Sequence, residues 1–323
     1  MPAPHMFSKY RGSCKTPCLQ VWHGHLARVS WAGRPCHEGV CKRLHRRRAA
    51  PFFGAAIAVM LCVCARAQVA TPQEEAFLKA WGAHVRTPND HKAVIEVCQS
   101  VMDKSSTLGE FLPVVKTLAA WHLLAGGKQA DAIRIFESAV INDKAARPIP
   151  RFADTMARRW LTRLDHARLE KALSVYYTDH VEFPSSLAPL MNLPPGKVPP
   201  KNDRFGDPWV YKIESFSRLT GVANQRYSLY SKNMGNKLSS LKALPAGVYG
   251  GNKSATIIGR KSSTPISIEF ETVTESGTQR GVATEGGLVS GIRFLKLGSD
   301  GRFALMIDSD CDFWVIATPA RSR

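Results

Sequence analysis

Beyond residue 70 the chain places apolar residues three and four positions apart, the pattern of amphipathic helices. Four helices are predicted on this basis, at 74–85, 92–102, 112–124 and 130–140. The turn residues Thr87–Asp90 separate the first pair, and Ala125–Lys128 joins the second pair. Because helical hairpins bury their apolar faces on neighbours, we expect this region to pack against the domain that follows.

The second pair of helices resembles the second half of a tetratricopeptide repeat. The resemblance rests on the spacing of Gly127, Ala132, Phe136 and Ala139, in which a glycine opens the turn and small side chains let two helices approach closely. The first half of the repeat is not matched, so an ordinary helical hairpin stays open as the alternative.

The prolines in Arg147–Pro150 cannot continue a helix interior, so we expect the helical region to end near residue 150. A long helix is then predicted from Phe152 to Asp179, ending before Phe183-Pro184. Short strands are predicted at Trp209–Ile213 and Arg226–Tyr230.

The last part of the chain alternates apolar and polar residues, as half-buried strands do. Strands are predicted at 264–274, 288–297, 303–307 and 312–317. Ser299-Asp300-Gly301 is a hairpin signal between the second and third of them. A small antiparallel barrel or sandwich is the expected outcome.

These patterns predict a multidomain α+β protein. Its parts are a helical, tetratricopeptide-like region at 68–150, a long helix with a small antiparallel sheet at 151–250, and a small all-β domain at 251–323. A length of 323 residues with 44% hydrophobic content is enough for more than one core.

An export signal is predicted at 42–67. The basic cluster Lys42–Arg48 precedes the apolar run Ala49–Cys64 and the small-x-small sequence Ala65-Arg66-Ala67, where a signal peptidase would cleave. An uncleaved membrane anchor is the alternative, although a membrane span needs about 20 apolar residues. The expected location is periplasmic, secreted or at the cell surface.

Residues 1–41 precede this signal. Cys14, Cys18, Cys36 and Cys41, with histidines among them, have a spacing that a zinc site can use. We instead expect translation to start near Val40, so that 1–41 is a falsely assigned or disordered leader.

The net charge of +18 is concentrated at the start of the chain. Residues 1–67 hold eleven basic residues and one acidic residue, which leaves a net charge of +8 spread over the rest. This charge does not predict a nucleic-acid partner.

Four features follow one another in the middle of the chain. A helix ending in Tyr176-Tyr177 precedes the aromatic–proline pair Phe183-Pro184. The motif Asp203-Arg204-Phe205-Gly206-Asp207-Pro208-Trp209-Val210-Tyr211 comes next, and Tyr227-Ser228-Leu229-Tyr230-Ser231 closes the series. In these features the segment 151–250 resembles the soluble domain of the type II secretion major pseudopilin (protein G).

The resemblance implies a short sheet folded back onto the long helix through Leu173. It implies structural roles for Phe183, Pro184, Asp203, Gly206, Pro208, Trp209, Tyr211, Tyr227 and Ser231. By their own chemistry, Gly206 permits a tight turn and Asp203 can accept backbone N–H bonds within it. The family's membrane helix and calcium loop are not carried over, because the predicted helix is strongly charged and 231–237 has no carboxylate.

Candidate chemistry is sparse. Cys98 and Cys311 can form a disulfide in an oxidising compartment, or can be two buried thiols. Asp308, Asp310 and Asp312 are spaced like the start of an EF-hand loop, but Phe313 stands at the sixth position, so we interpret them as an acidic strand end facing water.

No catalytic, cofactor-binding or metal-binding residue is predicted. Asp165 and His166 are neighbours on a predicted helix, where they point about 100° apart and do not face each other. We therefore do not expect an enzyme.

The expected function is that of a non-catalytic exported structural or interaction protein linked to type II secretion or type IV pilus-like machinery. Two alternatives stay open: a periplasmic protein- or peptide-binding adaptor on a pilin-like scaffold, and a hydrolase with an unrecognised site. The expected partners are proteins, including secretion or pilus assembly subunits. No nucleic acid is expected, and a membrane contact only through an uncleaved signal segment.

Overall fold

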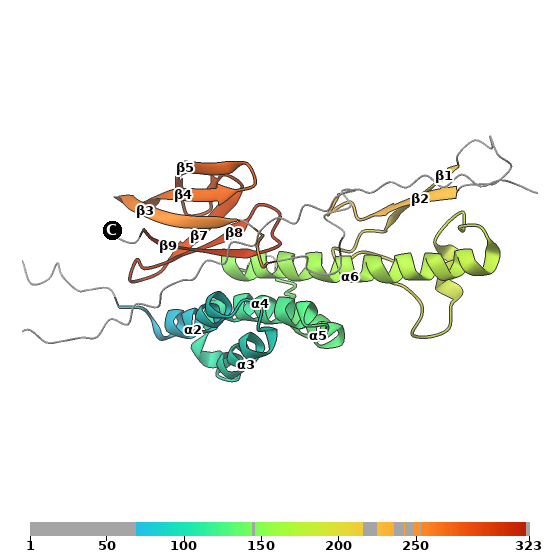
Figure 1. Cartoon of the computed structure of the whole chain (residues 1–323), viewed down its shortest axis with the longest axis horizontal. Coiled ribbons are helices and arrows are strands. Elements are labelled where there is room, and N and C mark those ends of the chain that lie inside the picture. The colour runs from blue at the N-terminus through green and yellow to red at the C-terminus, as the bar shows by residue number, and fades with distance from the viewer. Residues whose placement is uncertain are drawn as a thin grey trace, which may run out of the picture. The chain divides into compact units, whose positions relative to one another are not determined.

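The structure, a computed structural model, describes residues 69–143, 146–215, 225–235, 242, 248–251 and 253–320. The predicted signal at 42–67 and the leader at 1–41 lie outside the described residues. The fold is mixed α/β (Figure 1). Its described part has five α-helices, a two-stranded sheet and a seven-stranded sheet. Among these helices none is both long and apolar enough for a membrane span.

The four helices predicted in the first region are confirmed to within two residues at each end. They are α2 (Pro72–Arg86), α3 (His91–Met102), α4 (Leu112–Ala125) and α5 (Gln129–Ala139), with short 3₁₀ turns at Ser105–Thr107 and Gly109–Phe111. Thr71 and Glu74 form a reciprocal capping box at the start of α2. Gly127 takes a φ of +77° in the turn between α4 and α5.

The long helix α6 (Pro148–His180) begins earlier than the sequence predicts. Pro148 and Pro150 lie in its first turn, where a missing N–H costs nothing because no intrahelical acceptor precedes it. The prolines therefore start the helix instead of ending the previous region. At 33 residues α6 is about 50 Å long.

Helix α6 extends from the helical region and the large sheet to the small sheet (Figure 1). Its two halves belong to two separate cores. Its first half, with Met156, Trp160 and Leu164, packs in one core with α2–α5 and the C-terminal strands. Its second half, with Leu169 and Leu173, packs in another core beneath the small sheet. The predicted boundaries at 150 and 250 stay predictions, since all described residues belong to one compact unit, Val63–Arg323.

The small sheet pairs β1 (Val210–Ser215) with β2 (Gln225–Tyr230) in antiparallel register. A 3₁₀ helix, η3 (Ala188–Asn192), precedes it and contributes Leu190 to the core on α6. The predicted strands are confirmed to within a few residues. Leu169 and Leu173 of α6 share one core with Trp209 and with Leu229 of β2.

The large sheet has the strand order β5-β4-β3-β9-β8-β7-β6. Its strands are β3 (Ser254–Ser263), β4 (Ile266–Thr274), β5 (Gly277–Thr284), β6 (Leu288–Val289), β7 (Ile292–Leu297), β8 (Ala304–Asp308) and β9 (Trp314–Pro319). Sequential neighbours are antiparallel, but β3 and β9 pair in parallel, which the sequence-based expectation of an antiparallel domain did not include. Because each of the seven strands runs opposite to the one before it in the chain, the first strand, β3, and the last strand, β9, run in the same direction.

The outer strands β5 and β6 approach each other, so that the sheet curls almost into a barrel. A Cβ built on Gly281 of β5 would lie 2.9 Å from Val289 of β6, and Ser290 donates a hydrogen bond of 2.7 Å to Gln279. The inward side chains, among them Phe270, Phe294 and Met306, form a core of their own.

The outward side chains of the C-terminal strands belong to the helical core. Leu305 and Ile307 of β8 alternate with Met306 and face the helices. The indole Nε1 of Trp314 donates a hydrogen bond of 2.8 Å to Thr117 of α4. The helical region thus packs against both α6 and the large sheet.

Candidate functional site

The predicted turn around Gly206 has the geometry expected from its residues. Oδ1 of Asp203 accepts hydrogen bonds from the backbone N–H groups of Phe205 (2.9 Å) and Asp207 (3.0 Å). Gly206 has a φ of +98°, which a side chain rarely permits. Pro208 follows in a single bridge with Asn202 immediately before β1.

Replacing Gly206 with alanine is expected to lower the free energy of unfolding by about 1–2 kcal/mol, because a Cβ is strained at positive φ. Chemical denaturation followed by tryptophan fluorescence measures this loss. Gly259→Ala is the matched control, since that glycine lies in β3 with open space around it and no positive φ. Equal stability of the two variants would contradict the role given to Gly206.

The other motif residues surround the small core on α6. Trp209 is buried and its Nε1 donates to the carbonyl of Pro200 at 3.1 Å. The hydroxyl of Tyr211 donates to the carbonyl of Pro184 at 2.8 Å, and burial raises the pKa of Tyr211 to about 12. The rings of Phe183 and Tyr227 contact each other edge-on, with their centroids 4.7 Å apart. The structure therefore brings these predicted residues together.

Ser231 joins the end of β2 to the same turn. Its hydroxyl is fully buried and donates to Oδ2 of Asp203 at 2.5 Å. The amide of Asn233 donates to Oδ2 of Asp203 at 3.2 Å and to Oδ2 of Asp207 at 2.7 Å. Both carboxylates are thus engaged by neutral donors of the chain.

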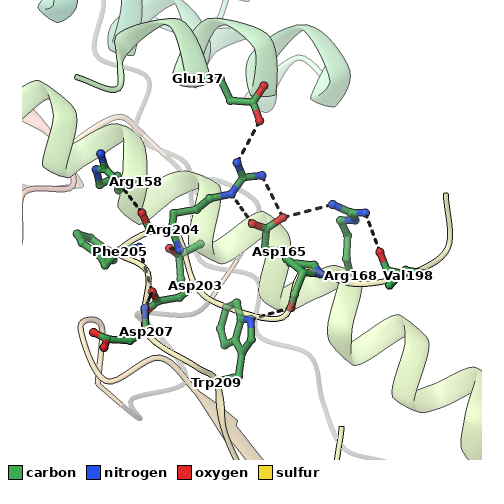
Figure 2. Close-up of polar contacts among 12 residues, drawn as sticks. Glu137, Arg158, Asp165, Arg168, Val198, Asp203, Arg204, Phe205, Asp207 and Trp209 are labelled. Atoms are coloured by element: carbon green, nitrogen blue, oxygen red, sulfur yellow. Dashed lines mark hydrogen bonds and ion pairs between the residues drawn. The ribbon is translucent and has the colours of Figure 1, made fainter. Parts of the chain in front are cut away.

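An arginine of the motif, Arg204, links this turn to two helices (Figure 2). Its Nε donates to the buried carboxylate of Asp165 on α6 at 2.5 Å, and its Nη1 lies 3.1 Å from Glu137 of α5. Arg158 of α6 donates to the backbone carbonyl of Arg204 at 2.7 Å. The turn, α5 and α6 are therefore held by charge-assisted hydrogen bonds.

Asp165 and His166 do not hydrogen-bond to each other, as the helix geometry predicts. The carboxylate of Asp165 accepts from Arg204 and Arg168, whereas Nε2 of His166 lies 3.0 Å from the carbonyl of Leu229. These contacts attach the small sheet and its turn to α6. We assign both side chains a positioning role.

A second junction, between α6 and the large sheet, centres on Asp312. Its carboxylate lies 2.7 Å from Nε of Arg159 and 2.6 Å from Nη2 of Arg163, and both arginines are largely buried. Burial opposes the charge of Asp312, but Arg163 and Arg159 outweigh it and hold its pKa below the usual value. Arg163 also lies over the ring of Trp160 at 4.4 Å.

The interpretation of the three aspartates as a strand end facing water is wrong for two of them. Asp308 is buried and accepts the backbone N–H groups of Asp312 (2.7 Å) and Phe313 (2.8 Å), while Lys253 pairs with its other oxygen at 3.1 Å. Asp312 is covered by the arginines of α6, and Asp310 is the exposed member. Their cationic partners, which are distant in the sequence, offset the energetic cost of burying the two carboxylates.

Three histidines of α2, α3 and α4 form a hydrogen-bonded chain that the sequence did not reveal. Nδ1 of His84 lies 3.1 Å from Nε2 of His122, and Nδ1 of His91 lies 3.0 Å from Nδ1 of His122. Because opposite nitrogens of His122 are used, the three rings do not converge on one point. No cluster within the described residues could hold a metal ion.

Two members of this histidine chain, His84 and His122, are held neutral by their surroundings. Burial lowers the pKa of His84 to about 4, and burial together with the charges of His84 and His91 lowers that of His122 to about 3. The rings of Trp121 and Tyr249 pack around the chain. We therefore expect His84 and His122 to resist protonation in the folded protein.

Cys98 and Cys311 are free thiols in this structure. Cys98 is completely buried in α3, and Cys311 is partly buried in the turn between β8 and β9. Burial raises the pKa of Cys98 to about 12 and that of Cys311 to about 11.

Alkylation of the native protein near pH 8 is expected to leave Cys98 unmodified, because the thiolate is the reactive form. In denaturant without reductant, both Cys98 and Cys311 are expected to react, which peptide mapping by mass spectrometry detects. Labelling that appears only after reduction would instead show a disulfide between them.

A polar cleft of about 800 Å³ lies between the loop after β2 and the large sheet. Its described lining comes from Asn233–Gly235, from Arg159 and Lys253, and from three hairpin turns of the sheet. These turns join β4 to β5, β6 to β7 and β8 to β9, so they share one end of the sheet. Binding sites are common at such mouths of β-barrels.

The arrangement is suited to holding parts of the chain together and to presenting polar groups around this cleft. The roles of Asp203, Gly206 and Trp209 are recognisable from the sequence, whereas the pairing of Arg204 with Asp165 and the partners of Asp312 are not. The chain shows no significant match to any family model, curated protein or solved structure.

Proposed function

We propose that this chain is a non-catalytic exported structural or interaction protein, related through residues 151–250 to the soluble domain of the type II secretion major pseudopilin. In this proposal it works with secretion or type IV pilus-like machinery through protein partners. The signal predicted at 42–67 carries it across the inner membrane.

The observation that carries the proposal is the closure of the Asp203–Trp209 turn onto α6. Trp209 packs with Leu169 and Leu173 of the helix, while Ser231 at the end of β2 bonds to Asp203. The motif on which the resemblance rests thus acts as one packed unit. In this proposal its side chains have scaffold roles.

Affinity capture tests this proposal. The tagged full chain, crosslinked in the envelope of its own cells, is expected to enrich pseudopilin, secretin or inner-membrane assembly subunits, identified by mass spectrometry. An exported, equally tagged protein of unrelated fold gives the background. Capture of none of these subunits above that background would contradict the link to secretion.

A second candidate function, a peptide- or protein-binding adaptor, is favoured by the polar cleft. Within the described lining no serine hydroxyl bonds to a histidine, lysine or carboxylate, since Ser290 bonds to Gln279 and Ser276 to Thr274. The cleft therefore supports binding rather than hydrolysis.

A further inference from the structure

The polar cleft has the size and surface of a binding site for a hydrophilic ligand. Its volume of about 800 Å³ falls within the range of about 300–1,000 Å³ that ligand pockets occupy. Hydroxyl groups of Ser276, Ser290 and Ser309 stand at its three hairpin turns. The hydroxyl of Ser309 can donate to and accept from a polar ligand such as a peptide backbone, and that of Ser290, which already donates to Gln279, can accept.

The cations of the cleft already have carboxylate partners in the protein. Arg159 pairs with Asp312 at 2.7 Å, a carboxylate that Arg163 also contacts, and Lys253 pairs with Asp308 at 3.1 Å. An anionic ligand would have to compete with these carboxylates for both cations. The charge pattern therefore disfavours an anion.

Two acidic side chains of the lining are exposed. Glu275 and Asp310 lie at the β4–β5 turn and the β8–β9 turn, and neither forms an ion pair within the described part of the chain, although the charge of Asp310 acts on that of Arg159. They come from two separate turns that open onto the same cleft. Their negative charge attracts ammonium and guanidinium groups.

We propose that the polar cleft binds a partner segment through its lysine or arginine side chains, with Glu275 and Asp310 as the charged contacts. The inference deepens the proposed function as an interaction protein, on which it rests, by naming the chemistry of the partner. A small free amine offers the same charge but would fill little of the cleft, so a protein segment is the expected source.

Fluorescence anisotropy of the full chain with a labelled peptide of alternating lysine and serine tests this inference. The Glu275→Gln, Asp310→Asn double variant is expected to bind about tenfold more weakly than the wild type, because two exposed ion pairs with the peptide are lost. Glu182→Gln removes an exposed carboxylate at the end of α6, far from the lining residues in sequence, and is expected to bind like the wild type.

Spermidine, a small free amine, serves as the competitor that distinguishes binding of such an amine from binding of a protein segment. We expect it to displace the peptide only at concentrations well above the peptide's own dissociation constant. Equal binding by the double variant and the wild type, displacement by spermidine as efficient as by unlabelled peptide, or no binding of the peptide at all would overturn the proposal.

The peptide-binding experiment and the affinity capture can fail independently of each other. Capture of secretion subunits by the double variant as efficiently as by the wild type, together with no peptide binding, would reject the cleft and keep the proposed function. Peptide binding without capture of those subunits would keep the cleft and reject the link to secretion.

Discussion

Replacing Asp312 with asparagine is expected to lower the free energy of unfolding by about 3–5 kcal/mol, the usual loss when one partner of a buried ion pair is removed. The carboxylate is shared by Arg159 and Arg163, whose side chains are only 11% and 4% exposed. Asparagine keeps the size of the side chain but no longer compensates these two charges. In the variant Arg163 still stacks on Trp160, so we expect the loss to lie nearer about 3 than about 5 kcal/mol.

Denaturation by urea, followed by circular dichroism, measures this effect. Asp310→Asn is the matched control: it removes the same charge two residues away, from an exposed side chain, and is expected to change stability by about 0.5 kcal/mol or less. The backbone contacts of residue 312, with Asp308 and with Nε1 of Trp160, are retained in the variant. Equal stability of the two variants would show that Asp312 does not hold α6 to the sheet.

The elements that the sequence predicted well are those with local causes. The helices in the first region follow from apolar spacing and from turn residues, and Gly206 and Asp203 act within a few residues of each other. The start of α6 was missed because proline breaks a helix interior but is tolerated in the first turn.

Two strands of the large sheet, β3 and β5, have no clear alternation in the sequence. The pairing of β3 with β4 shifts register between Ile257 and Gly259 and again between Arg260 and Ser262, which breaks the period of two. Most of β5 is exposed and contains few apolar residues. Both strands are stabilised mainly by their neighbours in the sheet, which a single sequence does not display.

The ionic junctions and the histidine chain could not be predicted for the same reason. Arg204 and Asp165 are 39 residues apart, Arg163 and Asp312 are 149 apart, and His84 and His122 are 38 apart. Each group alone is an ordinary charged or polar residue. Only the packing of α6 against its neighbours brings them into contact.

The histidine chain leads to the last prediction, a loss of stability in mild acid. Unfolded histidine has a pKa of about 6.5, whereas His84 in the folded protein has a pKa of about 4 and His122 one of about 3. Below pH 6.5 the unfolded state therefore binds protons that the folded state does not. The stability present above pH 6.5 is lost as the pH falls toward 4.

The size of this loss follows from the two pKa values of His84. A native pKa of about 4 and an unfolded one of about 6.5 correspond to about 3 kcal/mol at pH 4 for this residue alone. Asp312 acts in a different range. Because its pKa is lowered from 3.8, its contribution is present above about pH 4 and is lost only below it.

Denaturation by urea at several pH values between 7 and 4 tests the prediction. His84→Gln is expected to flatten the decrease, since glutamine does not titrate, while His180→Gln is the control, because His180 is exposed at the end of α6 and lies outside the chain of rings. A decrease in the His84 variant as steep as in the wild type would assign the acid sensitivity to other groups. A flattened decrease in that variant alone would show that folding excludes a proton from His84.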